Sequence, residues 1–157
     1  MKIIKYFTFI VVLCFSFCSP SNQNRVTKTL SNNSIHKLEM FLNAFGVESD
    51  GFPYIQASVD FETNSSSCNV SYDNPKFKDT IYSLDKKEID SLRIFLASSN
   101  LNGLKKEYTF GPTDQPTSTT KIYMAQDTIT IKDYSLQGDS PLPELYRIVY
   151  KLNKNFR

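Results

Sequence analysis

Few side chains in this 157-residue sequence have the chemistry of a catalytic or metal-binding centre. His36 is the one histidine, and two of the three cysteines, Cys14 and Cys18, fall in or beside an N-terminal leader described below. The remaining pair, His36 and Cys68, is too small for the usual four-ligand His/Cys zinc site. A Ser-His-Asp triad would have to recruit His36, and neither a Gly-x-Ser-x-Gly motif nor a glycine-rich phosphate loop is present. We therefore predict no catalytic residue, no metal site and no cofactor.

Paired carboxylates are the next candidates for chemistry. Asp60 and Glu62 lie two residues apart in a run that alternates apolar and polar residues, so a strand would place both on its polar face, about 7 Å apart. Two carboxylates can hydrolyse a glycosidic bond. Acids on the exposed face of a strand also deter pairing between sheet edges, which is the structural interpretation.

The most distinctive loop is Gly111–Thr117, with the sequence GPTDQPT. Its two prolines limit flexibility, while Thr113, Asp114 and Gln115 offer hydrogen-bond donors and acceptors. Rigid polar loops on a sheet often carry binding sites, so these three residues form a candidate contact loop. The alternative is a turn in which Asp114 bonds its own backbone.

The N-terminal 17 residues are typical of a signal peptide. Lys2 and Lys5 precede an apolar run, Tyr6–Phe17, that is too short to span a hydrocarbon core of about 30 Å. The run ends at Cys18, which resembles the lipidated cysteine of bacterial lipoproteins. Two acyl chains on Cys18 would anchor the protein stably in a membrane. Ordinary cleavage near Cys18–Ser21 and an uncleaved anchor are the alternatives.

The mature chain has balanced charge. Removing the leader takes away two lysines and no acid, which leaves 16 basic and 16 acidic side chains. A nucleic-acid-binding domain would carry a basic excess, so we predict no nucleic-acid partner. With Cys18 lipidated, Cys68 has no cysteine to pair with and is expected to be a buried, inert thiol. Without lipidation, a Cys18–Cys68 bridge becomes feasible.

Residues 34–157 form a single predicted domain, and residues 18–33 before it are polar and aperiodic, as expected of a flexible tether. The domain is expected to open with a helix that Gly46 ends, because its apolar residues recur at helical spacing. These residues are Ile35, Leu38, Phe41, Leu42 and Phe45.

Six strands and two further helices are expected after that helix. The strands are at residues 54–62, 68–72, 80–84, 106–110, 121–125 and 128–134. Asp85 and Glu88 fit a capping box that opens a helix ending near Ser98–Asn100. Pro141 or Pro143 opens the last helix, which presents a stripe of apolar residues: Leu145, Ile148, Val149 and Leu152. The predicted class is α+β, with an antiparallel sheet of about five or six strands and two or three helices packed mainly on one face.

This arrangement resembles a family of small, uncharacterised lipoproteins of Bacteroidota-type bacteria. The resemblance covers roughly Tyr54–Leu152 and rests on the Cys18 leader and four segments: Ser83–Ile89, Tyr108, Thr113–Pro116 and Pro141–Tyr146. It implies an envelope location and a compact α+β domain, and it transfers no catalytic residue. Surface-exported lipoproteins of such bacteria often have acidic residues after the cysteine, and Ser19–Asn24 has none. That favours the inner leaflet of the outer membrane.

The leading hypothesis is an envelope lipoprotein, lipid-anchored at Cys18, whose domain is a non-catalytic binding or interaction module with an envelope protein as its partner. One alternative is a carboxylate-dependent envelope hydrolase or carbohydrate-active enzyme that uses Asp60, Glu62 or Asp114. Another is an inhibitor or immunity-type protein that inserts the Asp114 loop into an enzyme.

Overall fold

The computed structural model describes residues 34–44, 47, 51–111 and 113–152. The predicted signal peptide, the lipidation site Cys18 and the tether therefore lie outside the described residues. Within the described residues, no helix has the length and apolarity needed to cross a bilayer.

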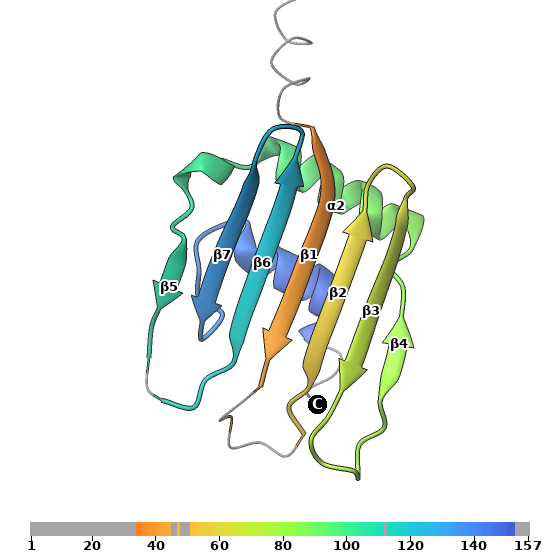
Figure 1. Ribbon diagram of the computed structural model, residues 1–157, viewed down its shortest axis with the longest axis vertical. Helices are drawn as coiled ribbons and strands as arrows, with labels where there is room; N and C mark the ends of the chain where they lie inside the picture. The colour runs from red at the N-terminus through yellow and green to blue at the C-terminus, as the bar shows by residue number, and fades with distance from the viewer. Residues whose placement is uncertain (1–33, 45–46, 48–50, 112, 153–157) are drawn as a thin grey trace, which may run out of the picture.

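The domain is built on one seven-stranded sheet with the order β4-β3-β2-β1-β6-β7-β5 (Figure 1). All neighbouring strands are antiparallel except β5, which runs parallel to β7. The strands are β1 (Ile35–Asn43), β2 (Tyr54–Asp60), β3 (Ser65–Ser71), β4 (Thr80–Tyr82), β5 (Glu107–Thr109), β6 (Thr117–Met124) and β7 (Thr128–Tyr134). The α+β class is confirmed, while the predicted count of five or six strands is wrong.

The extra strand is β1, which replaces the helix predicted at Ile35–Gly46. Leu38 and Leu42 satisfy a helical spacing, but together with Met40 they also alternate along a strand, and all three are buried. Phe41, assigned to the helical stripe, points to the other side and is 43% exposed. As the central strand, β1 is hydrogen-bonded to β2 on one side and β6 on the other, and these long-range pairings override the local pattern.

The remaining strands occupy the predicted regions with shifted ends. The strand predicted at residues 128–134 is confirmed without change as β7. By contrast, β6 begins at Thr117, four residues before the predicted start at Lys121. The two hydroxyl residues Ser118 and Thr120 face the core and are fully buried, so the sequence there lacks the apolar alternation that marks a half-buried strand.

The helical part of the described domain consists of one longer α-helix, a short segment of one α-helical and one π-helical turn, and one 3₁₀ turn. The capping box is confirmed: Asp85 Oδ1 accepts from the Glu88 amide at 2.8 Å, and Glu88 Oε2 accepts from the Asp85 amide at 2.9 Å, at the start of α2 (Lys86–Ser98). The last predicted helix is interrupted. It consists of one α-helical turn, α3 (Leu142–Leu145), and a π-helical turn, η2 (Tyr146–Tyr150). Lys151 interrupts it with a left-handed conformation of φ 53°, and Leu152 is helical again. A 3₁₀ turn, η1 (Leu101–Gly103), follows α2.

Both helices lie behind the sheet in Figure 1, and the core forms between them and that face. The sheet contributes Leu38, Ile55 and Ile122, which are fully buried against Leu92 of α2 and Val149 of η2. No described helix covers the opposite face, which we call the open face. One layer of helices on one side of an antiparallel sheet leaves the other side to solvent or to a partner.

Candidate functional site

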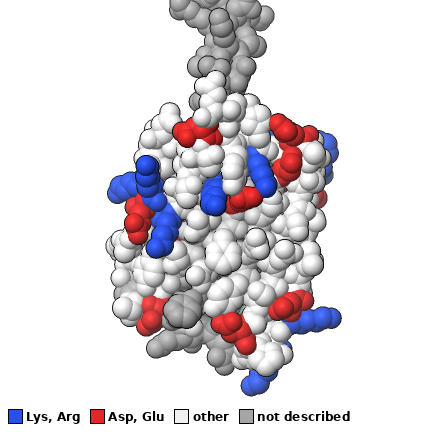
Figure 2. Space-filling model, viewed as in Figure 1, with Lys and Arg blue, Asp and Glu red and all other residues white. Residues whose placement is uncertain are grey.

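The strand register places an exposed aromatic ring in the middle of the open face. Phe41 of β1 lies opposite Gln56 of β2 and Thr119 of β6, and Gln56 in turn lies opposite Asn69 of β3. This row crosses four adjacent strands, and its members on those strands are uncharged. The next residue along the row is Lys132 of β7, which lies opposite Thr119. In Figure 2, which shows this face, charged side chains gather above and below an uncharged middle.

A shallow hollow of about 430 Å³ opens around this row, and we call it the sheet hollow. In the adjacent row Ser58 of β2 lies opposite Ser67 of β3 and Glu39 of β1, and Glu39 lies opposite Lys121 of β6. The two serines are short, so the surface sinks between the longer side chains around them. The lining of the hollow is Glu39, Met40, Phe41, Gln56, Ala57, Ser58, Ser67, Asn69, Thr119 and Lys121.

The polar side chains of the sheet hollow are available to a ligand. Five uncharged ones make no side-chain hydrogen bond with any described residue, namely Gln56, Ser58, Ser67, Asn69 and Thr119. Each amide offers both donors and acceptors, and each hydroxyl offers a donor and two acceptor lone pairs. Unpaired polar groups clustered beside an exposed aromatic ring are typical of a binding surface.

The acid at the edge of the hollow is already neutralised within the protein. Glu39 accepts from Lys37 Nζ at 2.7 Å and from the Tyr123 hydroxyl at 2.7 Å. The hydrogen bond from Lys37, followed by that from Tyr123, lowers the pKa of Glu39, and the same contact raises the pKa of Lys37. Lys37 also lies 5.8 Å from the centre of the Tyr123 ring. The carboxylate therefore stays ionised with both oxygens engaged, and Lys121 opposite it makes no ion pair with a described residue.

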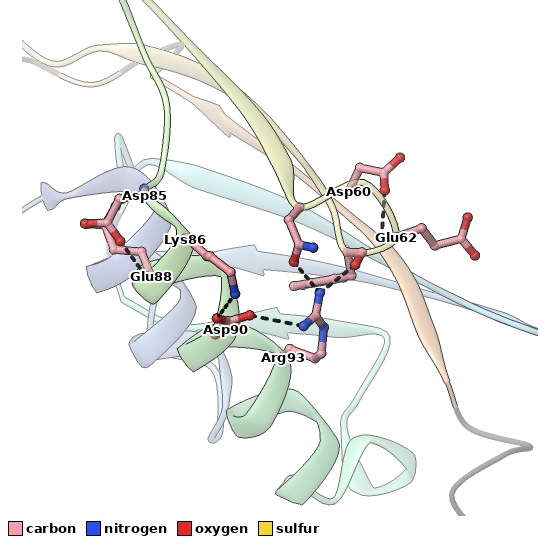
Figure 3. Close-up of polar contacts among 9 residues, drawn as sticks. Asp60, Glu62, Asp85, Lys86, Glu88, Asp90 and Arg93 are labelled. Carbon is pink, nitrogen blue, oxygen red and sulfur yellow. Dashed lines mark hydrogen bonds and ion pairs between the residues drawn. The ribbon is translucent and has the colours of Figure 1, made fainter.

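The predicted carboxylate pair does not share a strand face. β2 ends at Asp60, so Glu62 lies in the following turn rather than on the strand (Figure 3). The carboxylate of Asp60 ends the strand, because its Oδ1 accepts from the backbone amides of Glu62 at 2.9 Å and Thr63 at 2.8 Å. The amide of Thr63 is the largest cause of the lowered pKa of Asp60.

Glu62 instead joins the one histidine in a chain of three side chains. His36 Nδ1 lies 2.5 Å from Glu62 Oε1, and His36 Nε2 lies 3.3 Å from Ser34 Oγ. Hydroxyl, imidazole and carboxylate thus follow one another in the order of a catalytic triad. The side chains of His36 and Glu62 are 39% and 67% exposed, so water competes for each contact. The sequence analysis named His36 as the histidine that a triad would need, but it did not predict the neighbours Ser34 and Glu62.

A second polar cluster, which the sequence analysis did not identify, connects α2 to the β2–β3 turn (Figure 3). Arg93 Nη2 donates to the Phe61 carbonyl and to Asn64 Oδ1, both at 2.6 Å, while Nη1 contacts Asp90 at 3.1 Å. Asp90 also pairs with Lys86 at 2.7 Å. The spacing of Lys86, Asp90 and Arg93 along one helix face was a usable signal for the ion pairs. The contacts of Arg93 with Phe61 and Asn64 hold the helix to the turn, which is a structural role.

The candidate contact loop lies away from both carboxylates. Thr113 and Asp114 are exposed, and Thr113 Oγ1 donates to Asp114 Oδ2 at 3.1 Å. The Gln115 amide donates to the Tyr134 hydroxyl at 3.1 Å, which ties the loop to β7. Figure 1 shows this β5–β6 connection at the end of the sheet opposite to the start of β1 and the end of β2. The structure therefore does not bring Asp114 together with Asp60 or Glu62.

A smaller hollow of about 290 Å³ lies between the start of α2 and η2. Its cations include Arg147 and Lys151. Both are paired with acids: Arg147 with Glu144 at 2.5 Å, and Lys151 with Glu88 at 3.0 Å. This hollow consequently presents little net charge to a ligand.

The described part of the chain contains no group of three or more His, Cys, Asp and Glu side chains placed to hold a metal ion. Cys68 is fully buried, as predicted, and is not in a disulfide. Burial raises the pKa of its thiol to about 11, which keeps it protonated at neutral pH.

Comparison with known proteins gives no match: no family model, no curated protein and no solved structure is significantly similar to this chain. The assignment of a function therefore depends on the geometry of the domain.

Proposed function

We propose that this chain is an envelope lipoprotein, anchored through Cys18 to the outer membrane, whose domain binds a partner through the open face without catalysing a reaction. The observation that carries the proposal is the sheet hollow around Phe41. Exposure of one face is ordinary for an antiparallel sheet. A hollow of about 430 Å³ that combines an exposed ring with unpaired amides and hydroxyls is a more specific feature of a binding site.

The position of the tether supports this role. The proposed tether, residues 18–33, would enter the domain at the start of β1. As a flexible coil of this length it would span about 20–24 Å, enough to hold the domain clear of the lipid headgroups. The loop at Thr113–Gln115 lies at the far end of the sheet in Figure 1 and would extend away from the membrane. Both the open face and this loop would then be accessible in the envelope.

In-cell photo-crosslinking tests the proposal. A benzophenone amino acid replaces Asn69, which lines the sheet hollow, or Ser91, an equally exposed residue on α2 behind the sheet. We expect a crosslinked product from position 69 that is absent from position 91 and is lost when Phe41→Ala is added. A product of equal yield from both positions, or one that survives Phe41→Ala, would refute binding through the open face. In the same cells Cys18→Ala should move the protein out of the membrane fraction.

Ester hydrolysis is a second candidate function, which the Ser34–His36–Glu62 contacts favour. With Glu62 accepting a hydrogen bond from Nδ1–H, His36 Nε2 can take the Ser34 proton as Oγ attacks an acyl carbon. The same proton then passes to the leaving alcohol, and a water releases the acid. Hydrolysis of p-nitrophenyl acetate at a rate that falls to background in Ser34→Ala but not in Ser71→Ala would support it. Equal rates for wild type and Ser34→Ala would exclude it.

A further inference from the structure

We infer that the sheet hollow binds a saccharide chain. This inference rests on the proposed function, in which the open face is the binding surface, and adds the chemical class of the ligand. Three features of the hollow carry it: the exposed ring of Phe41, the unpaired amides and hydroxyls beside it, and the lack of an unpaired acid.

Phe41 provides the apolar platform. Its side chain is 43% exposed on a flat face, and phenylalanine has no polar group to satisfy. One face of a pyranose ring presents C–H groups, which stack on an aromatic ring, while the hydroxyls point outward from the edge. A sugar stacked on Phe41 would direct its hydroxyls toward the polar residues on the neighbouring strands, since Gln56 and Thr119 lie directly opposite Phe41.

The polar residues match a polyhydroxylated ligand. Gln56 and Asn69 face each other across β2 and β3, and Ser58 and Ser67 do so in the next row. Neighbouring sugar hydroxyls each donate and accept, as do the amide and hydroxyl side chains of the hollow. Four adjacent strands extend about 14 Å across the sheet, so the row can contact more than one sugar ring.

The charges around the hollow disfavour a cationic ligand. The lining of the hollow contains one acid, Glu39, and one base, Lys121. Both carboxylate oxygens of Glu39 are occupied by Lys37 and Tyr123, so a cationic ligand would find no unpaired acid there. Lys37 and Lys121 share this one carboxylate, so the three side chains together carry one net positive charge.

The composition of the hollow distinguishes a saccharide from a protein partner. The cores of protein interfaces are enriched in aromatic residues, Met and Arg and depleted in Ser, Ala, Lys and Glu. Here the lining includes Ser58, Ser67 and Ala57, and Phe41 is its one aromatic residue. A volume of about 430 Å³ lies within the range of about 300–1,000 Å³ for small-ligand sites.

Titration of the full-length, detergent-solubilised protein with neutral tetrasaccharides tests the inference. The probes are chitotetraose, cellotetraose and maltotetraose, and binding is followed by calorimetry. We expect at least one to bind, with affinity reduced about tenfold in Phe41→Ala and reduced also in Gln56→Ala. Phe77→Ala is the matched control, because Phe77 is 44% exposed but lies outside the lining of the hollow. Circular dichroism verifies that each variant is folded.

The outcomes separate this inference from the proposed function. If no tetrasaccharide binds while the crosslink from position 69 is still formed and still requires Phe41, the open face binds another class of partner and the saccharide inference is wrong. If neither occurs, both are wrong. Binding that is unchanged in Phe41→Ala, or reduced as much in Phe77→Ala, would also overturn the inference, because the Phe41 ring would then not be the platform.

Discussion

Replacing Asp133 by alanine should lower the free energy of unfolding by about 3 kcal/mol. Asp133 lies near the end of β7 and is fully buried. Its carboxylate accepts from the Tyr146 hydroxyl at 2.8 Å and from the backbone amides of Gly138 at 2.8 Å and Gln137 at 3.2 Å. It therefore ties the loop after β7 and the π-helical turn η2 to the sheet. Gly138 has no room for a side chain, because an added Cβ would lie 2.7 Å from Asp133 Oδ2.

The magnitude follows from the groups left without a partner. Alanine at position 133 leaves the Tyr146 hydroxyl and the Gly138 amide buried without an acceptor, at about 1–3 kcal/mol each. The saved cost of burying a carboxylate offsets part of this loss. Asparagine keeps one acceptor oxygen, so Asp133→Asn should lose about half as much. Tyr146→Phe removes one donor and leaves the carboxylate two backbone amides, so we expect a loss of about 1 kcal/mol.

Urea unfolding followed by far-ultraviolet circular dichroism measures these differences, since the chain has no tryptophan to report by fluorescence. The expected order of destabilisation is Asp133→Ala, then Asp133→Asn, then Tyr146→Phe. Asp139→Ala is the control, because this exposed aspartate should change the stability by less than about 0.5 kcal/mol. An Asp133→Ala protein as stable as the control would refute the assigned role of the buried carboxylate.

Three further predictions concern other parts of the domain. Cys68 should react with iodoacetamide at pH 8 only after denaturation. It is fully buried, and its pKa of about 11 leaves about one thiol in a thousand ionised. Rapid labelling of the native protein would contradict this prediction. Arg93→Ala should lower the free energy of unfolding by about 1–2 kcal/mol in urea, because Arg93 donates to the Phe61 carbonyl. Arg147→Ala removes only a surface ion pair and should cost less than about 0.5 kcal/mol. Equal losses would count against the structural role of Arg93. Stability should be constant above about pH 4.5 and should decrease as pH falls further, because carboxylates with lowered folded-state pKa values must then be protonated. Urea midpoints that do not change between about pH 3 and 7 would contradict this prediction. The carboxylates concerned are Glu39, Asp60, Asp90 and Glu144.

The parts of the fold that the sequence predicted are those in which local chemistry and tertiary packing agree. Asp85 and Glu88 form the capping box that opens α2, and the helix ends at Ser98, within the predicted range. The alternation of β2 is equally clear, because Ile55 and Val59 are buried between more exposed neighbours. In these segments one periodicity fits the apolar residues and no other does.

The errors fall where one pattern fits two structures. Leu38 and Leu42 suit both a helix and a strand, and the pairing of β1 with two distant strands decides between them. The first half of β6 was missed because Ser118 and Thr120 are polar. The alternation of apolar residues that predicts a half-buried strand is therefore absent there, although both side chains are buried. Ser118 Oγ lies 2.8 Å from the Tyr150 hydroxyl, a partner 32 residues away that only the fold supplies.

The candidate site was harder to predict than the fold. Asp60, Glu62 and Asp114 were chosen by residue type, but Asp60 caps a turn, Glu62 pairs with His36, and Asp114 lies at the other end of the sheet. The sheet hollow is formed by neutral residues with no motif, and its row through Phe41 exists only after four strands are aligned. The spacing of residues along the chain does not predict how these four strands are aligned.

Occupancy of the open face in the native envelope is the central claim, and maleimide labelling of Ser67→Cys tests it most directly. Ser67 is exposed and lines the sheet hollow, and Ser91→Cys on α2 is the exposed control. Cys68 is buried and gives little background. We predict that Ser67→Cys reacts several-fold more slowly in intact envelopes than in the purified protein, whereas Ser91→Cys reacts equally in both. Equal rates for Ser67→Cys in envelopes and in solution would show that nothing covers the open face and would contradict the account.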